Sequence, residues 1–259
     1  MSFKIIDTHM HVGPTPGRMV PDHSIASLIK LMDKLDIEKG ISANESTLSM
    51  QLEKGLADDF KAYEESNGRI FSFFGYEPQH SDMCIDFMRK HYTDHRCVGI
   101  KIHPSYSKVR ADDEGFRPVW EAAKEMNLPI MSHTWDVSTY NPNQIYGVAA
   151  LFEKYIAEYP EVTFVFGHCG GRYNGIKQAI EIGKKYPNAH YDITGDIWLN
   201  GFIEELVDGV GADRIVYGSD WTMIEQRPMM GVVLGSNLPQ LDKEKILRYT
   251  ASRIYFGEE

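Results

Sequence analysis

The chain has 259 residues, of which 42% are hydrophobic and 25% are charged, as in a globular protein with a buried core. Its 27 Lys and Arg against 37 Asp and Glu leave a net charge of −10, which argues against nonspecific nucleic-acid binding. No run approaches the roughly 18 apolar residues of a membrane span. The segment of residues 1–7 is too short for a signal peptide, and a charged residue occurs too early in it. Three cysteines without a CxxC pair suit reduced thiols in a cytoplasmic protein: Cys84, Cys97 and Cys169.

Eight short apolar, β-branched runs follow one another along the chain, and their starts lie 25 to 36 residues apart. One strand, one helix and two loops need about that many residues, so the spacing indicates a repeated βα unit. The expected strands are residues 3–6, 39–42, 69–74, 98–102, 129–132, 162–166, 189–193 and 214–217.

The segments between these runs have helical spacing. In residues 25–35 the apolar side chains recur at i, i+3, i+4 and i+7, and residues 151–157 show a shorter pattern of the same kind. Alternating strands and helices predict a parallel sheet covered by helices. Eight units favour a closed barrel over an open doubly wound sheet. The sequence contains no glycine-rich nucleotide-binding motif, which would have supported the open sheet. We therefore expect an α/β fold, a single-domain (β/α)8 TIM barrel over residues 1–259.

Polar residues stand where five of the expected strands end, the position at which barrels of this type place their chemistry. Four of these ends carry at least one histidine and the fifth carries an aspartate. The residues are His9 and His11, then His103, His133, His168 and Asp220. Ten randomly placed histidines would rarely give this pattern.

His9 and His11 are two residues apart on an extended segment, so their side chains point to the same face. Both can therefore reach one ion in the barrel mouth, and His133 and Asp220 can complete the set. Three neutral imidazoles and a carboxylate suit a borderline divalent ion, with a position left for water. The sequence therefore predicts one divalent metal ion, zinc in preference to manganese, and no second metal.

These motifs resemble the amidohydrolase superfamily, and within it the amidohydrolase-related branch. That branch also contains the metal-dependent decarboxylases of aminocarboxymuconate semialdehyde and related aromatic acids. The resemblance spans nearly the whole chain and lies in residues 5–11, 99–104, 166–171, 215–221 and the closing helix 245–256. Thr250, where the family commonly has Asn, departs from the pattern in that helix.

The resemblance implies a barrel in which His9, His11, His133 and Asp220 surround the metal. It also implies that His168 is a further ligand or a catalytic acid/base. Some superfamily members bridge two metals with a carboxylated lysine near the position of Lys101, a role that we do not expect here.

Other polar residues remain candidates with weaker signals. Lys101, His103, Arg172 and Trp135 are candidate substrate contacts. Asp7 is expected to orient a ligand histidine rather than to bind metal. Loops 12–22, 105–115 and 135–147 are expected to form the pocket walls, and Arg18 in the first of them is a further candidate for binding an acidic substrate.

We expect a metal-dependent hydrolase of a small amide, lactone or ester. Metal-bound water would have its pKa lowered toward about 7. Asp220 would act as general base, and His168 as acid/base or oxyanion stabiliser. The alternative is a non-oxidative decarboxylase of a small carboxylic acid, and a non-catalytic binding barrel is a third reading. The expected partner is a small molecule, without nucleic acid or membrane. A homodimer is also expected from the family.

Overall fold

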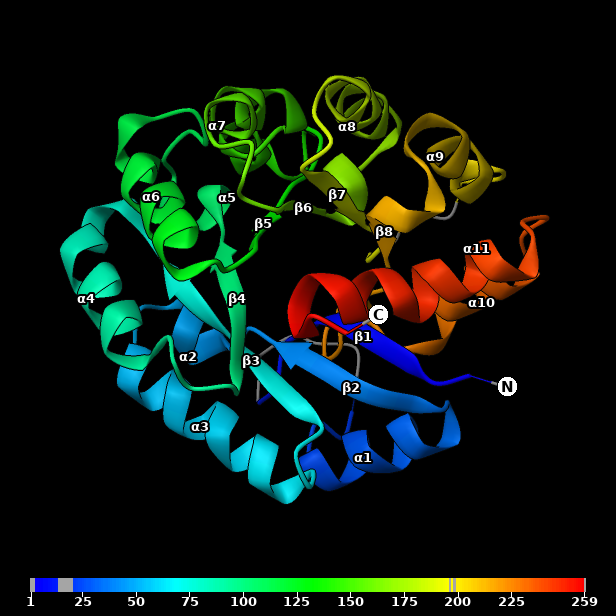
Figure 1. Cartoon of the computed structure of the whole chain (residues 1–259), viewed down its shortest axis with the longest axis horizontal. Coiled ribbons are helices and arrows are strands. Elements are labelled where there is room, and N and C mark those ends of the chain that lie inside the picture. The colour runs from blue at the N-terminus through cyan, green and yellow to red at the C-terminus, as the bar shows by residue number, and fades with distance from the viewer. Residues whose placement is uncertain (1–2, 14–20, 196, 198, 259) are drawn as a thin grey trace.

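Eight parallel strands form one sheet in the order β1-β2-β3-β4-β5-β6-β7-β8, with helices around the outside (Figure 1). The computed structural model describes residues 3–13, 21–195, 197 and 199–258. The strands are β1 (Ile5–Met10), β2 (Ile37–Ser42), β3 (Ile70–Tyr76), β4 (Cys97–Ile102), β5 (Ile130–His133), β6 (Phe164–Gly167), β7 (Ala189–Asp192) and β8 (Ile215–Val216).

The barrel closes between its first and last strands. Thr8 N donates to Tyr217 O at 2.9 Å, and Asp220 N donates to His9 O at 2.8 Å. A parallel bridge joins Met10 to Trp221. The predicted single-domain (β/α)8 barrel is therefore confirmed.

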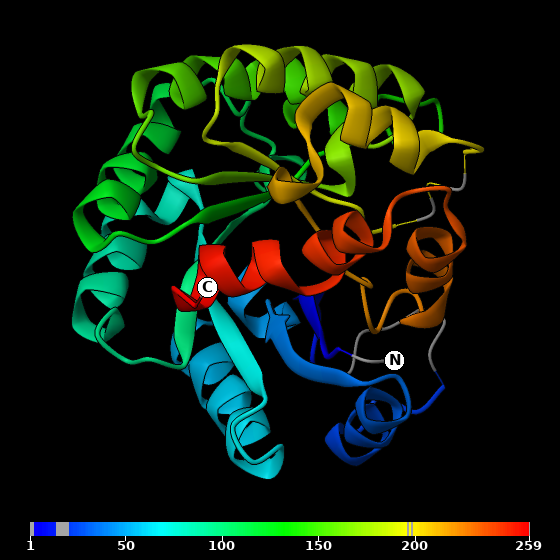
Figure 2. The same cartoon turned by 45° about the vertical axis from the view of Figure 1, so that its right-hand side comes forward.

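Helices cover the outer face of the sheet, as Figures 1 and 2 show from two directions. They are α1 (Ile25–Lys34), α2 (Glu45–Leu48), α3 (Leu52–Glu65), α4 (Ser81–His91), α5 (Pro104–Ser107), α6 (Arg117–Met126), α7 (Glu153–Glu158), α8 (Tyr173–Lys185), α9 (Phe202–Val210), α10 (Arg227–Gly235) and α11 (Gln240–Glu244). Short 3-10 turns are η1 (Pro78–His80), η2 (Glu114–Phe116), η3 (Pro142–Tyr146), η4 (Ala149–Phe152), η5 (His168–Gly170) and η6 (Ala212–Arg214). No helix in the described ranges has the length and apolar character needed to cross a membrane.

The local sequence explains where the first of these helices begins and which face it buries. Ser24 caps α1 because its side-chain oxygen accepts a hydrogen bond from Ser27 N at 3.2 Å. Leu28 and Met32, one turn apart, are the buried residues of α1 and belong to the main core between sheet and helices. The helix predicted over 25–35 is thus confirmed to within one residue.

The C-terminal segment closes one end of the barrel. After α11 the chain continues as π-helix in η7 (Lys245–Tyr249) and η8 (Ser252–Phe256), and this segment crosses the barrel end in both views (Figures 1 and 2). Tyr255 and Ala251 pack on the apolar residues that fill the barrel interior: Ile6, Ile41, Ala43, Phe71, Phe73, Val98, Met131, Val165 and Val216. The opposite end, where the strands finish, is left for the site.

Seven of the strands lie within two residues of the expected bounds at each end, whereas β1 and one helix differ more. Residues 3–6 were expected as the first strand, whereas β1 runs from Ile5 through the polar motif to Met10. Asp7, Thr8 and His9 are all buried there. Polar side chains that point into a barrel can still belong to a paired strand, so the polar motif extends β1 and does not end it. The helix expected over 151–157 is divided between η4 and α7.

Candidate active site

A cavity of about 490 Å³ opens where the strands end. The residues from the strand ends that line it are His9, His11, Lys101, His103, His133, His168 and Asp220. Trp135 also lines the cavity, whereas Arg172 does not. Most of the polar residues selected from the sequence therefore meet in one place, as expected from the parallel strands.

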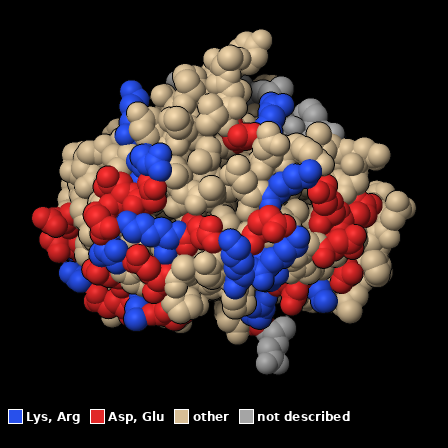
Figure 3. Space-filling model, turned by 90° about the horizontal axis from the view of Figure 1, so that it is seen from above, with Lys and Arg blue, Asp and Glu red and all other residues tan. Residues whose placement is uncertain are grey.

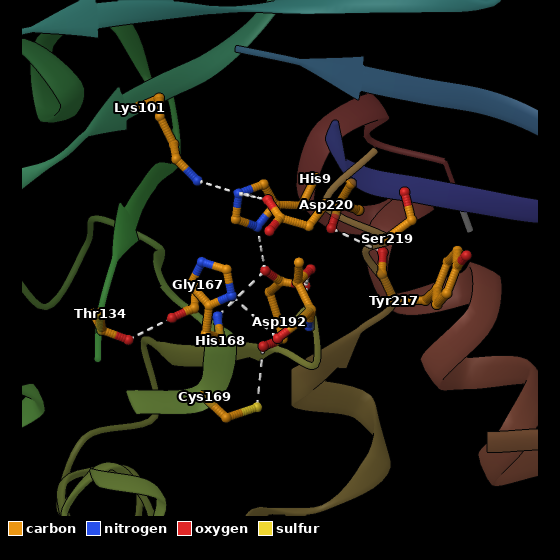
Figure 4. Close-up of polar contacts among 12 residues, drawn as sticks. His9, Lys101, Thr134, Gly167, His168, Cys169, Asp192, Tyr217, Ser219 and Asp220 are labelled. Atoms are coloured by element: carbon orange, nitrogen blue, oxygen red, sulfur yellow. Dashed lines mark hydrogen bonds and ion pairs between the residues drawn. The ribbon is translucent and has the colours of Figure 1, made fainter. Parts of the chain in front are cut away.

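His9 is held in one orientation by a carboxylate beneath it. Its Nδ1 lies 2.6 Å from Asp192 Oδ2, and both side chains are buried (Figure 4). A proton on Nδ1 donates to this carboxylate, so the lone pair of His9 lies on Nε2 and faces the cavity. Lys101 Nζ lies 2.7 Å from that Nε2. Burial and the charge of Lys101 hold the pKa of His9 well below its ordinary value, so the imidazole is neutral.

His168 and Asp220 both lie in the left-handed backbone region, with φ of 62° and 64°. Few residues other than glycine adopt this conformation, and such residues gather at functional sites. His168 Nδ1 lies 3.1 Å from Thr194 O. A proton on Nδ1 donates to this carbonyl, so the lone pair of the ring lies on Nε2. Burial lowers the pKa of His168 to about 4, so this ring is also neutral. The two side chains approach His9 from the segments that follow β6 and β8 (Figure 4).

Three of these residues form a group that can bind a metal ion. One ligand atom from each of His9, His168 and Asp220 lies within 4.8 Å of the other two, and all three residues are buried. Two neutral imidazoles and a carboxylate are a suitable donor set for zinc or manganese. The Asp192 carboxylate behind His9 is the partner that metal-binding histidines usually have. The residues present therefore fit a divalent ion.

His11 is next to this group. Its Nδ1 lies 2.7 Å from Ala43 O, and its Nε2 lies 3.1 Å from Asp220 Oδ1. If Nδ1 carries the proton that the carbonyl accepts, Nε2 and the carboxylate oxygen can approach only around a cation. That cation is either a second proton or a metal ion. Burial by itself raises the pKa of Asp220, but the contact with His11 and the neighbouring imidazoles outweigh it and hold this pKa well below its ordinary value.

His133, the fourth ligand that we expected, lies in the same cavity but outside the three-residue group. Its Nε2 lies 3.1 Å from Gln144 Oε1, which also accepts a hydrogen bond from Ser105 Oγ at 2.9 Å. The His133 ring stacks on His103 with centroids 4.1 Å apart. His103 continues the stack to Tyr106, at 3.7 Å. These rings form an aromatic wall of the cavity.

Two other candidate substrate residues are adjacent to each other near the His168 side of the cavity. The Trp135 ring lies 5.1 Å from that of His168. Arg172 is exposed, with its guanidinium carbon 5.8 Å from the centre of the Trp135 ring. Arg172 thus contacts a wall residue without lining the cavity. Arg18 lies outside the described residues.

Asp192 is the residue of the candidate site that the sequence analysis missed. It is the last residue of β7, so the strand-end criterion applied to that strand would have found it. Asp7, which we expected to orient a histidine ring, makes different contacts. Its carboxylate accepts hydrogen bonds from Ser219 N at 3.0 Å, Ser219 Oγ at 2.7 Å and Gln226 Nε2 at 2.9 Å. Asp7 therefore holds the segment just before Asp220 against β1.

Close packing around His9 requires a glycine at position 218. A Cβ on Gly218 would lie 2.5 Å from Asp192 Oδ1 and 2.6 Å from His9 Cβ. Both distances are below ordinary contact, so any larger residue would displace the His9–Asp192 pair.

A family model described as Amidohydrolase matches residues 6–257. This chain belongs to the amidohydrolase family. The family resemblance expected from the motifs at the strand ends is thus confirmed over nearly the whole chain. No curated protein sequence matches this amidohydrolase.

Several solved structures share the fold of this amidohydrolase. A 2,6-dihydroxybenzoate decarboxylase from Rhizobium is 16% identical, with 97% of this chain and 98% of that chain covered and a TM-score of 0.70. A TIM-barrel protein from Bordetella bronchiseptica is 15% identical over 97% and 98% of the two chains, with a TM-score of 0.80. A dihydroxybenzoic acid decarboxylase from Polaromonas sp. JS666, solved with manganese and 2-nitroresorcinol, is 14% identical over 97% and 96%, with a TM-score of 0.72. At these identities the likeness concerns the fold alone.

Proposed function

We propose that this amidohydrolase is a metal-dependent hydrolase of a small amide, lactone or ester. The observation that carries the proposal is the buried group of His9, His168 and Asp220, in which Asp192 orients His9. His11 and His133 complete the proposed ligand set from the same cavity. A bound divalent ion, zinc or manganese, would supply a water molecule of lowered pKa and would polarise the substrate carbonyl.

The residues of the chain would then move the protons. Asp220 would take a proton from the attacking water as its oxygen bonds to the carbonyl carbon. If His168 keeps its proton on Nδ1, which faces Thr194 O, its Nε2 would hold the metal ion; with the proton on Nε2 it would instead stabilise the oxyanion that forms. When the bond from carbon to nitrogen or oxygen breaks, Asp220 would return the proton to the leaving amine or alcohol. The aromatic wall of His103, His133 and Tyr106, together with Trp135, would position a planar substrate.

The second candidate is decarboxylation on the same site. Lys101 is the one lysine or arginine among the described residues that line the cavity, and it would attract a substrate carboxylate. Solved decarboxylases also share the fold. In this reaction the bond to the carboxyl carbon breaks and CO2 leaves. His168 or Asp220 would then pass a proton taken from water to the carbon that keeps the electron pair, which leaves a hydroxide ion.

The test is turnover of a panel of small amides, lactones, esters and aromatic acids by metal-loaded protein. Release of an amine or alcohol supports hydrolysis, and release of CO2 selects decarboxylation. We expect Asp220→Asn to lower kcat by about 10²–10⁴-fold. Asp86→Asn, on the exposed face of α4, is the matched control and should keep full activity. Full activity of Asp220→Asn with metal still bound would refute the assignment of Asp220.

A further inference from the structure

Lys101 is an unusual neighbour for a metal-binding histidine. It lies on β4 with only 1% of its surface exposed, and it points across the barrel mouth toward His9 (Figure 4). Among the described contacts, its ammonium makes one hydrogen bond, 2.7 Å long, to His9 Nε2. The proposed mechanism gives this contact no role.

The acceptor of that hydrogen bond is the atom that a metal ion needs. Asp192 takes the proton of His9 Nδ1, so Nε2 has the one lone pair that His9 can offer. Asp220 Oδ1, the proposed carboxylate ligand, lies 3.8 Å from the same Nε2. One lone pair cannot accept from an ammonium and bind a metal ion at the same time.

The charges around Lys101 also indicate that it competes with a metal ion. Burial lowers the pKa of the Lys101 ammonium to about 8, whereas the two buried carboxylates that it faces, Asp192 and Asp220, act in the opposite direction and favour its charge. A divalent ion would be attracted by the same carboxylates and repelled by the ammonium. The lysine and the metal ion are therefore alternative cations for one position.

We propose that Lys101 is an internal competitor of the metal ion for His9 Nε2 and so sets the metal affinity of the site. Metal binding breaks the Lys101–His9 hydrogen bond and leaves the ammonium to face the cavity, where a substrate anion can bind it. This inference rests on the proposed metal-dependent function. It gives Lys101 the opposite role to that of a carboxylated lysine, which would bind the metal.

The test compares Zn²⁺ affinities of wild type, Lys101→Met and Lys101→Gln by competition with a chromophoric chelator, so activity is not the readout. Both variants remove the ammonium, and Met keeps the unbranched shape of the side chain up to the position of Cε. We expect Zn²⁺ to bind both about 10- to 100-fold more tightly than wild type, since a hydrogen bond from an ionised donor is no longer broken. Lys61→Met, an exposed lysine on α3, is the matched control and should bind like wild type.

The outcomes separate this inference from the proposed function. Equal affinity in wild type and variants would overturn the competition while leaving the metal site intact. Weaker binding by the variants would also overturn it, because Lys101 would then support the metal. Zn²⁺ binding by the variants but not by wild type would support the competition. Absence of binding in all four proteins would overturn both proposals. Thermal melts establish that each variant is folded. If only one of the two Lys101 variants folds, its Zn²⁺ affinity is sufficient for the test.

Discussion

At the scale of single residues, the site depends on side chains held by a second polar group. His9 is oriented by Asp192, and Asp220 is contacted by His11. Asp192 itself accepts hydrogen bonds from Thr194 Oγ1 and from Thr194 N, so its carboxylate is fixed in turn. Such supporting groups determine which ring nitrogen carries the proton and hence which one can bind a cation.

Replacing Asp192 with Asn should weaken metal binding without unfolding the protein. The amide keeps the shape of the carboxylate but loses its charge, so His9 Nδ1 is held less firmly and Nε2 becomes a poorer ligand. Changes of this kind usually cost about 10- to 100-fold in metal affinity. The measurement is a Zn²⁺ competition titration of purified Asp192→Asn.

Asp58→Asn is the control for that variant, because Asp58 is an exposed residue paired with Lys54 on α3. Its Zn²⁺ affinity should equal that of wild type. Unchanged affinity in Asp192→Asn would mean that the hydrogen bond to His9 does not orient a metal ligand.

At the scale of secondary structure elements, the two ends of the barrel have different roles. The strand ends present the polar residues of the cavity, and η8 closes the other end with Tyr255. The Tyr255 ring packs edge-on against Phe73, with centroids 5.8 Å apart. Its hydroxyl is buried with no hydrogen-bond partner among the described residues. The stability of this end should therefore depend on the ring and not on the hydroxyl.

Truncation of this aromatic side chain should destabilise the fold while sparing the site. We expect Tyr255→Ala to lower the free energy of unfolding by about 3–5 kcal/mol, as for other buried aromatic residues. Tyr255→Phe should leave it unchanged or raise it, because the variant removes only an unpaired polar atom. Urea denaturation measures both effects. The control is Tyr249→Ala, because Tyr249 is 39% exposed.

Zn²⁺ affinity of folded Tyr255→Ala should match that of wild type, since the cavity lies at the other end of the barrel. A loss of stability in Tyr255→Phe as large as that in Tyr255→Ala would show that the hydroxyl has a partner in solution.

At the scale of the whole molecule, most charged side chains are spread over the surface, and a few carboxyl groups are buried. On the face drawn in Figure 3, acidic and basic side chains lie intermingled, and no continuous basic surface is seen there. Inside, Asp59 on α3 is 1% exposed, and one of its oxygens accepts a hydrogen bond from Ser72 Oγ at 2.6 Å. Its other oxygen has no partner in the described chain.

Asp59 should make the stability of the fold depend on pH. Burial raises its pKa from 3.8 to about 7. Below about pH 4 the carboxyl is protonated in both the folded and the unfolded chain. As the pH rises from 4 to 7 the unfolded chain ionises first, so this residue lowers the stability of the fold, and above 7 the full cost remains.

Asp59→Asn removes this dependence. Relative to wild type, its free energy of unfolding should rise between pH 4 and pH 8, by at most about 4 kcal/mol. Urea denaturation at several pH values measures the difference, and Asp58→Asn should show no such trend. A difference between Asp59→Asn and wild type that is the same at every pH would mean that Asp59 has the same pKa in the folded and the unfolded chain.

Much of the fold could be predicted because its signals are local. Strand-forming runs, helical spacing and their regular alternation are properties of neighbouring residues, and eight such units imply a closed barrel. The limits of β1 were less accessible, because Asp7, Thr8 and His9 are polar yet buried inside a barrel. The local sequence pattern does not show which polar side chains will be buried inside the barrel.

The residues of the site were largely recognisable because parallel strands bring their ends together. That argument placed His9, His11, Lys101, His168 and Asp220 in one cavity without any contact being known. It could not say which of them would touch. Asp192 contacts His9, a residue 183 positions away along the chain, and such a partner is chosen by barrel closure.

The sequence by itself determined the number of βα units, the family and the identity of the polar residues at the barrel mouth. These follow from short-range patterns and from which residues stand at strand ends. Only the tertiary structure decided that Asp192 orients His9, that Gln144 contacts His133 and that Lys101 occupies the lone pair of His9. These contacts depend on the register of strands far apart in the chain and on distances of a few ångströms, which no local pattern encodes.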